Sequence, residues 1–405
     1  MTVNSIPTWA ITGVLGLMTI VTIISTSSIS TQQNNSCHAF LASNTTQTFT
    51  LILTADSGKF AGVSEAEYII LAMGNTAKAV PPQHKSCQQI IGGIIHDQNV
   101  FVVTTGIGPV SAALCTHHFM LACSKHVREL VFFGTSGWSP QMGGVIDSKR
   151  GCNDTIHSRK PIARIGDVCI TPMAVNWDCK KSSWSQQAAG YPNVCTHLAE
   201  DSSPVNESLH GMCLFGSPLP SSLALANKIL TLAKTTIYPE RPTSIQHAEM
   251  LYWNAMANGT GNTFFYNTTQ QPITPSVYGY RECVEVDSQF MYSGAPWDQV
   301  AREYAAMAIG QGVGSTDVFA VAAMEAIGFA EAMIQFPRIP FTNIRVASNM
   351  NHGYLIQKEK GHVFEVPPNI DMSDGYKYAI QTGSQIILQM FASRRGSIRD
   401  HFQQI

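Results

Sequence analysis

The sequence predicts an α/β fold in which glycine-rich turns follow the ends of buried strands. The apolar run Leu130–Phe133 leads directly into the turn Gly134–Gly137, and the run Val100–Val103 is followed closely by the turn Gly106–Pro109. Short apolar runs of this kind are typical of buried strands, and glycine lets the backbone approach a ligand because it lacks a Cβ atom. Backbone N–H groups at strand ends can gather around an anion or a sugar. The two turns therefore predict a ligand-binding crevice at one edge of a sheet.

A hairpin and a helix surround the first glycine turn. Two apolar runs, Gln88–Ile95 and Val100–Thr104, flank a polar stretch at 96–99, which predicts an antiparallel pair of strands. Pro109–Cys123 is predicted to be the helix that leaves the turn. The other predicted elements are four strands and one helix, in chain order Thr50–Leu53, Gly166–Pro172, Glu282–Val286, the helix Ala322–Phe336, and Phe341–Ala347.

The composition is that of a globular protein of enzyme size. The chain has 405 residues, of which 44% are hydrophobic and 13% charged, so it can bury a large core. The formal net charge is −2 and there is no lysine-rich run, so we expect no nucleic-acid partner. The sequence has no Cys-x-x-Cys pair and no His-x-x-x-His pattern, so we expect no metal site and no metal cofactor.

The N-terminus predicts entry into the secretory pathway. Trp9–Ile24 carries no charge and is rich in Ile, Leu, Val and Met, and small residues follow it. The run is shorter than the roughly 20 residues that span a bilayer. Residues 1–30 are therefore interpreted as a signal peptide or an N-terminal membrane anchor, and 31–47 as a flexible segment. We expect a secreted protein of the extracellular space or cell wall, or one of the vacuole or endoplasmic reticulum lumen, with membrane attachment only through an uncleaved leader.

Two stretches, 148–220 and 238–280, are predicted to be loop-rich insertions. The first is rich in Pro, Asn, Ser and Trp, and the second in aromatic residues, which either cap a pocket or pack the insertion onto the sheet. N-glycosylation sequons fall in both stretches and near the N-terminus, and glycans need exposed loops. The sequons are at Asn34, Asn44, Asn153, Asn206, Asn258 and Asn267.

The cysteines also indicate an oxidising compartment. Four of the ten lie in the first insertion and are interpreted as disulfide staples: Cys152, Cys179, Cys195 and Cys213. Three more are candidates for pairing: Cys37, Cys87 and Cys283. The remaining three lie on predicted core elements and are interpreted as buried, small apolar residues: Cys115, Cys123 and Cys169. The pairing itself does not follow from the sequence.

From Thr48 to Arg394, the order of these segments resembles the nucleoside phosphorylase and nucleosidase superfamily, including its plant bark-storage and wound-inducible relatives. The most specific short match is the pair Met324–Glu325, between a strand-like run and a helix. The resemblance implies a three-layer α/β/α fold with a central mixed twisted sheet, formed by a domain over 48–400 that carries the two insertions. It also implies a homo-oligomer.

The resemblance implies a purine nucleoside as ligand and cleavage of its N-glycosidic bond. Glu325 would accept hydrogen bonds from the ribose hydroxyls, Met324 would offer the sugar an apolar face, and Phe290 would stack on the base. Arg345 would lie near the nucleophile, or would form a salt bridge to Glu325 or Asp287. The candidate catalytic residues are Asn349, Glu325 and Arg345. The candidate substrate-binding residues are Gly108, Thr135, Ser136, Gly137, Phe290, Met324, Glu325 and Asn349.

The sequence departs from the superfamily at the positions that carry chemistry. Asn349 stands where many members have an aspartic acid that protonates the purine, and this favours 6-oxopurine nucleosides. After the first strand, where nucleosidases carry a water-activating glutamate, the stretch Thr54–Lys59 offers only Asp56. Phe132 and Phe133 precede the second glycine turn, where hexameric phosphorylases hold phosphate with an arginine, and Ala323 replaces a second glutamate.

Two classes of function remain open from the sequence. The first is an enzyme that cleaves purine nucleosides by hydrolysis, or by phosphorolysis with phosphate as co-substrate. The second is a storage or nucleoside-binding protein with weak or no turnover, like the bark-storage relatives. A membrane-tethered receptor is a more remote alternative, since one apolar segment cannot form a transport path by itself.

Overall fold

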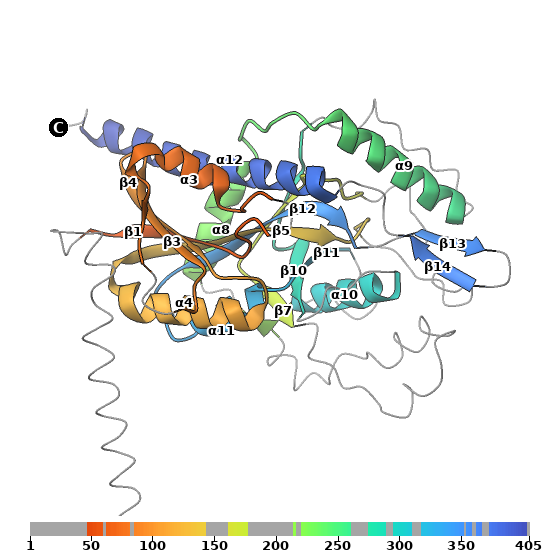
Figure 1. Ribbon diagram of the computed structural model, residues 1–405, viewed down its shortest axis with the longest axis horizontal. Coiled ribbons are helices and arrows are strands. Elements are labelled where there is room, and N and C mark those ends of the chain that lie inside the picture. The colour runs from red at the N-terminus through yellow and green to blue at the C-terminus, as the bar shows by residue number, and fades with distance from the viewer. Residues whose placement is uncertain are drawn as a thin grey trace, which may run out of the picture.

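The protein has three layers, with helices on both faces of a central mixed β-sheet (Figure 1). The computed structural model describes residues 47–59, 62–81, 85–142, 161–176, 214–215, 220–260, 274–288, 295–309, 317–351, 354–358, 362–366 and 372–402. The α/β/α architecture expected from the sequence is confirmed.

The central sheet contains twelve of the described strands. Its main path runs in the order β2 (Lys78–Ala79), β3 (Gln89–Ile95), β4 (Gln98–Thr104), β1 (Phe49–Thr54), β5 (Val127–Trp138), β11 (Phe319–Ala323), β10 (Cys283–Asp287), β7 (Ala174–Asn176) and β8 (Leu214–Phe215). A branch leaves β5 through β12 (Phe341–Met350), β6 (Val168–Thr171) and β9 (Val277–Gly279). A separate hairpin is formed by β13 (Tyr354–Lys358) and β14 (His362–Val366).

Strand β5 is the centre of the sheet. It pairs in parallel with β1 and β12, and its last residues, Gly137 and Trp138, pair antiparallel with β11. The second glycine turn of the sequence therefore lies inside a strand, where β11 and β12 flank the backbone of β5. This placement brings the ends of several strands to one edge of the sheet.

Alternate residues of β5 face two different helical layers, as the period of two in a strand requires. Leu130 and Phe132 belong to the apolar cluster that includes α4 (Pro109–Cys123) and α11 (Ala326–Met333). Val131 and Phe133 belong to the cluster on the opposite face. The helices of that second cluster are α3 (Glu67–Met73), α8 (Pro220–Ala233) and α12 (Met372–Phe402).

Two further helices extend the layers toward β10 and β11. Helix α10 (Ala295–Ala308) contributes Ala301 and Tyr304 to a cluster with Val284 and Val286 of β10. Helix α9 (Thr243–Thr260) buries Trp253 in a third cluster, with Trp138. Two short 3₁₀ helices, Gly74–Thr76 and Ser124–His126, follow α3 and α4.

The predicted elements around the first glycine turn are confirmed. Strands β3 and β4 form the expected hairpin, with the turn reduced to His96 and Asp97, which both adopt positive φ values. Helix α4 has the predicted bounds, Pro109–Cys123. The helix predicted over Ala322–Phe336 begins instead at Ala326, because the alanine-rich residues before it form β11 between β5 and β10.

The two stretches predicted to be loop-rich insertions contain regular elements. Strands β6, β7 and β8 fall within 148–220 and join the central sheet, and helix α9 falls within 238–280. The buried Trp253 packs that helix against the sheet, as expected for an aromatic residue of the second insertion. The sequons at Asn34, Asn44, Asn153, Asn206 and Asn267 lie outside the described residues.

Two disulfide bonds correct the interpretation of the core cysteines. Cys87 is bonded to Cys115 of α4, and Cys169 of β6 to Cys283 of β10, with Cα atoms 4.8 and 5.9 Å apart. Cys115 and Cys169 are therefore crosslinked, although both are buried as predicted, and Cys123 is also disulfide-bonded. The expected pairing of Cys87 and of Cys283 is confirmed. The four cysteines predicted to staple the first insertion lie outside the described residues.

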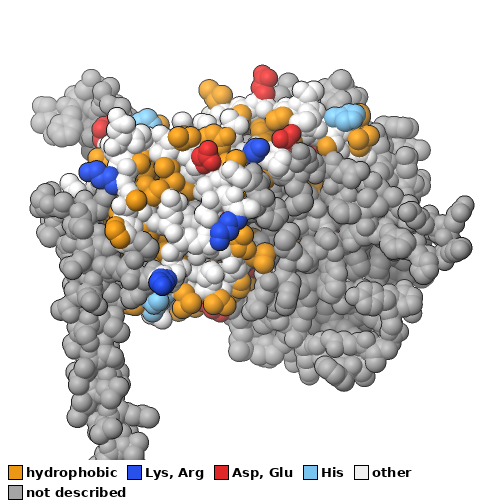
Figure 2. Space-filling model, viewed as in Figure 1, with side chains coloured by type: hydrophobic (Ala, Val, Ile, Leu, Met, Phe, Trp, Pro, Cys, Tyr) orange, Lys and Arg blue, Asp and Glu red, His pale blue; other side chains and the backbone are white. Residues whose placement is uncertain are grey.

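In the part of the chain that the structure describes, no helix is both long and apolar enough to cross a membrane. The predicted leader at 1–30 lies outside these residues. On the face seen in Figure 2, the described Lys and Arg side chains lie apart from one another.

Gly328 permits the close contact between α11 and α4, and we predict that Gly328→Ala is destabilising. An added Cβ atom would lie 1.8 Å from the carbonyl oxygen of Pro109. In an exposed helix the same change would gain about 1 kcal/mol. Here the backbone clash should outweigh that gain and lower the free energy of unfolding by roughly 1–3 kcal/mol. Urea denaturation measures this change, with the exposed Glu331→Ala of the same helix as control; equal midpoints for the two variants would contradict the packing argument.

Candidate functional site

A buried arginine and four carboxylates meet beside Gly134 of β5, near the carboxyl ends of β10 and β11. Arg345 lies on β12 opposite Gly134 of β5, and its side chain is fully buried. Its Nε donates to Glu285 Oε1 of β10 at 2.6 Å, and its Nη2 to Glu325 Oε2 at 3.3 Å. Its charge is also felt by Asp287 and Glu65. The predicted salt bridge from Arg345 to Glu325 is confirmed, and Glu285 is a partner that the sequence analysis missed.

The ring of Phe132 completes the surroundings of Arg345. The guanidinium carbon lies 4.7 Å from the ring centroid, within the range of a cation–π contact. Phe132 occupies the stretch before the glycine turn, where phosphorylases of the superfamily would hold phosphate with an arginine. In this chain that stretch therefore supplies an aromatic wall to the cluster.

Glu325 joins the two glycine turns. It lies between β11 and α11, is 6% exposed, and its Oε1 accepts a long hydrogen bond of 3.4 Å from the backbone N–H of Gly108. Its Oε2 accepts from the N–H of Met324 at 3.3 Å and from Arg345. The candidates Gly108, Met324, Glu325 and Arg345 therefore lie together in the structure.

Glu65 lies at the end of β1, where the sequence analysis found only Asp56. One oxygen, Oε2, accepts from the backbone N–H groups of Ala55 and Asp56 at 2.8 and 3.1 Å. The other, Oε1, accepts from the N–H of Thr135 at 2.8 Å and lies 3.3 Å from its hydroxyl. Glu65 thus connects the first strand to the second glycine turn.

Asp56 is engaged elsewhere, which corrects the expectation that it substitutes for a glutamate. Its Oδ1 accepts from the N–H of Lys59 at 2.9 Å, and its Oδ2 from the hydroxyl of Tyr376 on α12 at 3.0 Å. Glu65 precedes the helical run of α3 by two residues. A carboxylate just before a helical run is the signal that could have identified it.

Gly134 is required by the approach of Arg345 and Glu65 to β5. A Cβ atom at this position would lie 2.2 Å from Arg345 Nη1 and 3.0 Å from Glu65 Oε1. Any other residue would push the guanidinium or the carboxylate away from the strand. The glycine of the turn therefore serves the close packing of charged side chains.

Glu65, Asp287 and Glu285 hold their protons more strongly than free carboxyl groups do. Burial raises the pKa of Glu65 and Asp287, and it raises the pKa of Glu285 to about 7 despite the opposing charge of Arg345. Mutual repulsion adds to this effect, since Glu325 raises the pKa of all three. One guanidinium faces four carboxylates, so the cluster favours a cationic ligand or a bound proton.

Two asparagines gather around Gly137 at the end of β5. A Cβ atom on Gly137 would lie 1.9 Å from Asn351 Oδ1 and 3.0 Å from Asn349 Nδ2. Ser348 Oγ lies 2.9 Å from Asn349 Oδ1, which leaves the amide N–H groups of Asn349 on the side of Gly137. Asn351 is 3% exposed and is held by its backbone N–H, which donates to Trp138 O at 2.8 Å.

The three remaining predicted site residues, Thr135, Ser136 and Phe290, differ in their surroundings. Thr135 faces Glu65, as described. Ser136 is turned away: its hydroxyl accepts the indole N–H of Trp138 at 3.0 Å and donates to Val346 O at 3.4 Å, so it serves the core rather than a ligand. Phe290 lies outside the described residues.

Four of the buried polar atoms without a hydrogen-bond partner, among the residues that the structure describes, belong to the Arg345 cluster and its surroundings. Native proteins leave few such atoms, and their presence together indicates a place for a ligand or water. The four at the cluster and beside Gly137 are Asp287 Oδ1, Asn343 Oδ1, Arg345 Nη1 and Asn351 Nδ2.

The raised pKa of Glu285 predicts a pH dependence of stability. The folded protein keeps a proton on Glu285 up to about pH 7, whereas the unfolded chain releases it near the usual value of 4.5. The contribution of Glu285 to the free energy of unfolding is therefore complete below pH 4.5 and falls as the pH rises to 7. Urea denaturation at pH 5 and pH 7.5 should show that wild type loses more stability over this interval than Glu285→Gln. An equal loss in both proteins would exclude a raised pKa at this residue.

Comparisons with known proteins agree with the sequence analysis over the first part of the domain. Residues 50–142 match the sequence model of the phosphorylase superfamily, a segment that contains β1, both glycine turns and Glu65. No protein of curated function matches the chain significantly.

Several solved structures are similar in fold at low identity. The 5′-methylthioadenosine/S-adenosylhomocysteine nucleosidase of Neisseria meningitidis, in complex with methylthio-immucillin-A, is 15% identical with a TM-score of 0.43, covering 85% of this chain and 99% of that one. A futalosine hydrolase mutant of Helicobacter pylori is 14% identical with a TM-score of 0.44 and the same two coverages. A nucleosidase of Colwellia psychrerythraea in complex with adenine is 18% identical with a TM-score of 0.42, covering 85% and 95%. The match over residues 50–142 confirms, for this segment, the resemblance to the phosphorylase superfamily that the sequence indicated.

Proposed function

We propose that the protein hydrolyses the N-glycosidic bond of purine nucleosides, with Glu65 as the base that activates water. The observation that carries this proposal is the position of the Glu65 carboxylate, which lies between the end of β1 and Thr135 and close to the Arg345–Glu325 pair. A general base works best when its pKa lies near the working pH, and burial moves the pKa of Glu65 upward from its usual value. Glu65 thus supplies the water-activating glutamate that the resemblance implies.

The cluster suits the transition state of this reaction. Breaking the bond builds positive charge on the ribose, and groups that bind this charge more tightly than the neutral substrate lower the barrier. Glu65, Asp287, Glu285 and Glu325 surround one guanidinium, so the site carries more acceptor groups than cations. Glu325, bonded to Gly108 and Arg345, has the position to accept the ribose hydroxyls.

The same charges favour water over phosphate as the nucleophile. A phosphate ion needs cationic donors that are free of carboxylates, and Arg345, the cation of this cluster, is bonded to Glu285 and Glu325. Phe132 stands before the glycine turn in place of a cation. Hydrolysis is therefore the proposed reaction, rather than phosphorolysis.

The departing purine would be stabilised by amides rather than by an acid. Asn349 directs its N–H groups toward Gly137, where the side-chain oxygen of Asn351 also lies, and the amide nitrogen of Asn351 is buried without a hydrogen-bond partner. Amide donors can bind N7 or the oxygen of a 6-oxopurine but cannot protonate the leaving base. This supports inosine and guanosine as substrates over adenosine.

The absence of an acid at Asn349 also supports a second candidate, a nucleoside-binding or storage protein with weak turnover. One experiment separates the two: the purified chain is incubated with inosine, guanosine and adenosine, with and without phosphate, and base release is followed. Release that is independent of phosphate supports the hydrolase. Binding without release supports the storage protein, and phosphate-dependent release would contradict the proposed nucleophile.

We also propose that the chain is exported, as the uncharged leader and the sequons predict. The disulfide bonds Cys87–Cys115 and Cys169–Cys283 support this, because such bonds persist mainly in oxidising compartments. Homo-oligomer formation stays a prediction of the resemblance.

Glu65→Gln should lower kcat for inosine by about 10²–10⁴-fold while changing KM little, because the amide keeps the shape of the side chain but cannot accept a proton. The measurement is initial-rate base release over a range of inosine concentrations. Glu67→Gln, two residues further on an exposed position, is the matched control and should retain wild-type kinetics. If both variants keep the wild-type kcat, Glu65 is not the base.

Asn349→Asp should shift the base preference toward adenosine. The new carboxyl can donate a proton to N7, and more of it is protonated as the pH falls, so the adenosine-to-inosine ratio of kcat/KM should rise most at low pH. Competition assays with the two nucleosides between pH 5 and pH 8 measure this ratio. Wild type that cleaves adenosine at least as well as inosine, or a ratio that the substitution leaves unchanged, would exclude the role given to Asn349.

A further inference from the structure

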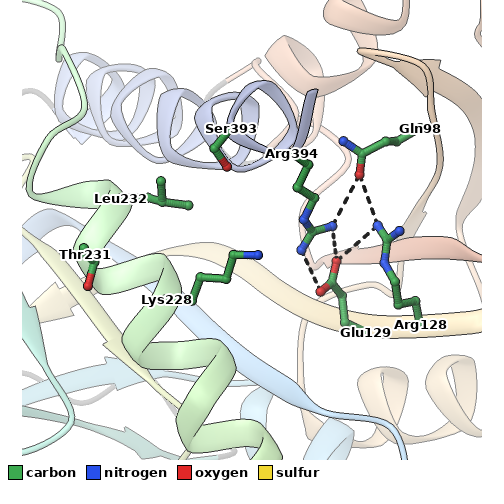
Figure 3. A pocket seen from close by; sticks show the side chains of 8 residues that line it. All are labelled: Gln98, Arg128, Glu129, Lys228, Thr231, Leu232, Ser393 and Arg394. Carbon is green, nitrogen blue, oxygen red and sulfur yellow. Dashed lines mark hydrogen bonds and ion pairs between the residues drawn. The ribbon is translucent and has the colours of Figure 1, made fainter. Parts of the chain in front are cut away.

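A cavity lies beside the beginning of β5, at the other end of this strand from Thr135 and Gly137. It has a volume of about 840 Å³, within the 300–1,000 Å³ typical of small-molecule sites. Strands β4 and β5 and helices α8 and α12 supply its walls (Figure 3). The lining residues are Gln98, Arg128, Glu129, Lys228, Thr231, Leu232, Ser393 and Arg394.

We propose that this cavity binds a small organic phosphate, a dianionic phosphate group on a body with apolar and hydroxyl groups. Three of the lining side chains are cationic and come from three different elements: Arg128 from β5, Lys228 from α8 and Arg394 from α12. One lining side chain, Glu129, is anionic. The formal excess of two positive charges matches the charge of a phosphate monoester.

The negative charge of Glu129 is neutralised by an arginine in the wall of the cavity. Arg394 binds it in a two-pronged ion pair, with Nη1 to Oε1 at 2.5 Å and Nη2 to Oε2 at 2.7 Å, and Thr50 donates to it at 2.6 Å. Burial would raise the pKa of Glu129, but the hydrogen bond and charge of Arg394 outweigh burial and hold the pKa below its usual value. Glu129 therefore stays ionised and fixes Arg394, and its charge is matched by that arginine.

Two cations remain for a ligand. Arg128 is 40% exposed and uses only its Nη2 atom toward Thr50, Gln98 and Glu129, so its other N–H groups remain available. Lys228 extends from α8 toward the arginines, and no hydrogen bond or ion pair joins it to them in Figure 3. This convergence contrasts with the single Lys and Arg side chains on the face shown in Figure 2.

The uncharged lining residues indicate the body of the ligand. Leu232 provides an apolar wall. The hydroxyls of Thr231 and Ser393 donate to the helix carbonyls of Asn227 and Met390 at 2.9 and 3.0 Å, so toward the cavity they can only accept hydrogen bonds. A ligand with its own hydroxyl donors beside the phosphate would satisfy them.

The cavity is separate from the proposed nucleoside site. Arg128 and Glu129 are among the first residues of strand β5, and Thr135 lies near its end. The seven residues from Arg128 to Thr135, at roughly 3.3 Å each, separate the two sites by about 23 Å along the strand. Occupation of the cavity therefore does not require the nucleoside site, and the proposal does not depend on the proposed hydrolase activity.

Isothermal titration calorimetry of the full chain with glycerol 3-phosphate tests the proposal. We expect saturable binding to one site and an affinity at least tenfold lower in Lys228→Gln, because the variant loses one charge-assisted hydrogen bond. Lys234→Gln, which removes an exposed lysine just after the same helix, is the matched control and should bind within twofold of wild type. Both lysines are exposed, so neither change should affect folding.

Two further titrations identify the chemistry. Inorganic phosphate should bind more weakly than glycerol 3-phosphate, since it cannot contact Leu232 or the two hydroxyls, and succinate should bind more weakly still. Absent or unsaturable binding of glycerol 3-phosphate would overturn the proposal. Equal losses in Lys228→Gln and Lys234→Gln would also overturn it by showing general charge attraction, and succinate binding as tightly as the phosphate ester would overturn the assignment to phosphates.

Discussion

The buried side chain of Arg345 is the constraint on which the rest of the site depends. A fully buried guanidinium is tolerated only when its charge and donors are matched, and removing a partner of such a pair typically costs about 3–5 kcal/mol. The matching groups come from β10, from the turn after β11 and from the loop before α3. One cation in the middle of the sheet thereby fixes the relative positions of segments that are up to 280 residues apart, from Glu65 to Arg345.

The carboxylates around Arg345 outnumber what one guanidinium can neutralise, and this surplus gives the site its chemical character. If the cluster served only to stabilise the fold, one carboxylate for each guanidinium would be enough to balance the buried charge. Here the excess leaves Glu65 and Asp287 with raised pKa values and leaves an unpartnered oxygen on Asp287. Strongly perturbed groups of this kind are a usual mark of functional sites.

Local patterns in the sequence predicted the elements that depend on local chemistry. The β3–β4 hairpin follows from two apolar runs that flank a short polar stretch, and helix α4 from the proline at its start, so both were predictable. The start of α11 was not, because Ala322 and Ala323 adopt a strand only through their neighbours β5 and β10. The core disulfides join residues 28 and 114 positions apart, and such pairing depends on the tertiary fold.

The proximity of the candidate site residues was predictable where one motif carries them, and was not predictable where a loop intervenes. Gly108, Glu325 and Arg345 converge as their motifs indicated. Glu65 was missed because it follows the end of β1 by eleven residues, and the intervening loop brings its carboxylate back to Ala55 and Asp56. Ser136 was assigned to the ligand because 134–137 was interpreted as a turn. In the structure β5 continues through these residues, and the alternation of the strand directs the hydroxyl of Ser136 to Trp138.

The position of β5 at the centre of the sheet limits which insertions and deletions the chain can accept. Its alternate residues face different helical layers, its first residues line one cavity, and its last residues contact Glu65 and the two asparagines. Inserting or deleting one residue in a strand exchanges the two faces of everything beyond that point. In β5 such a change would place Phe132 and Phe133 in each other's layers and would move Thr135 away from Glu65. We therefore regard β5 as a segment whose length is fixed, even where the identity of its apolar residues could vary.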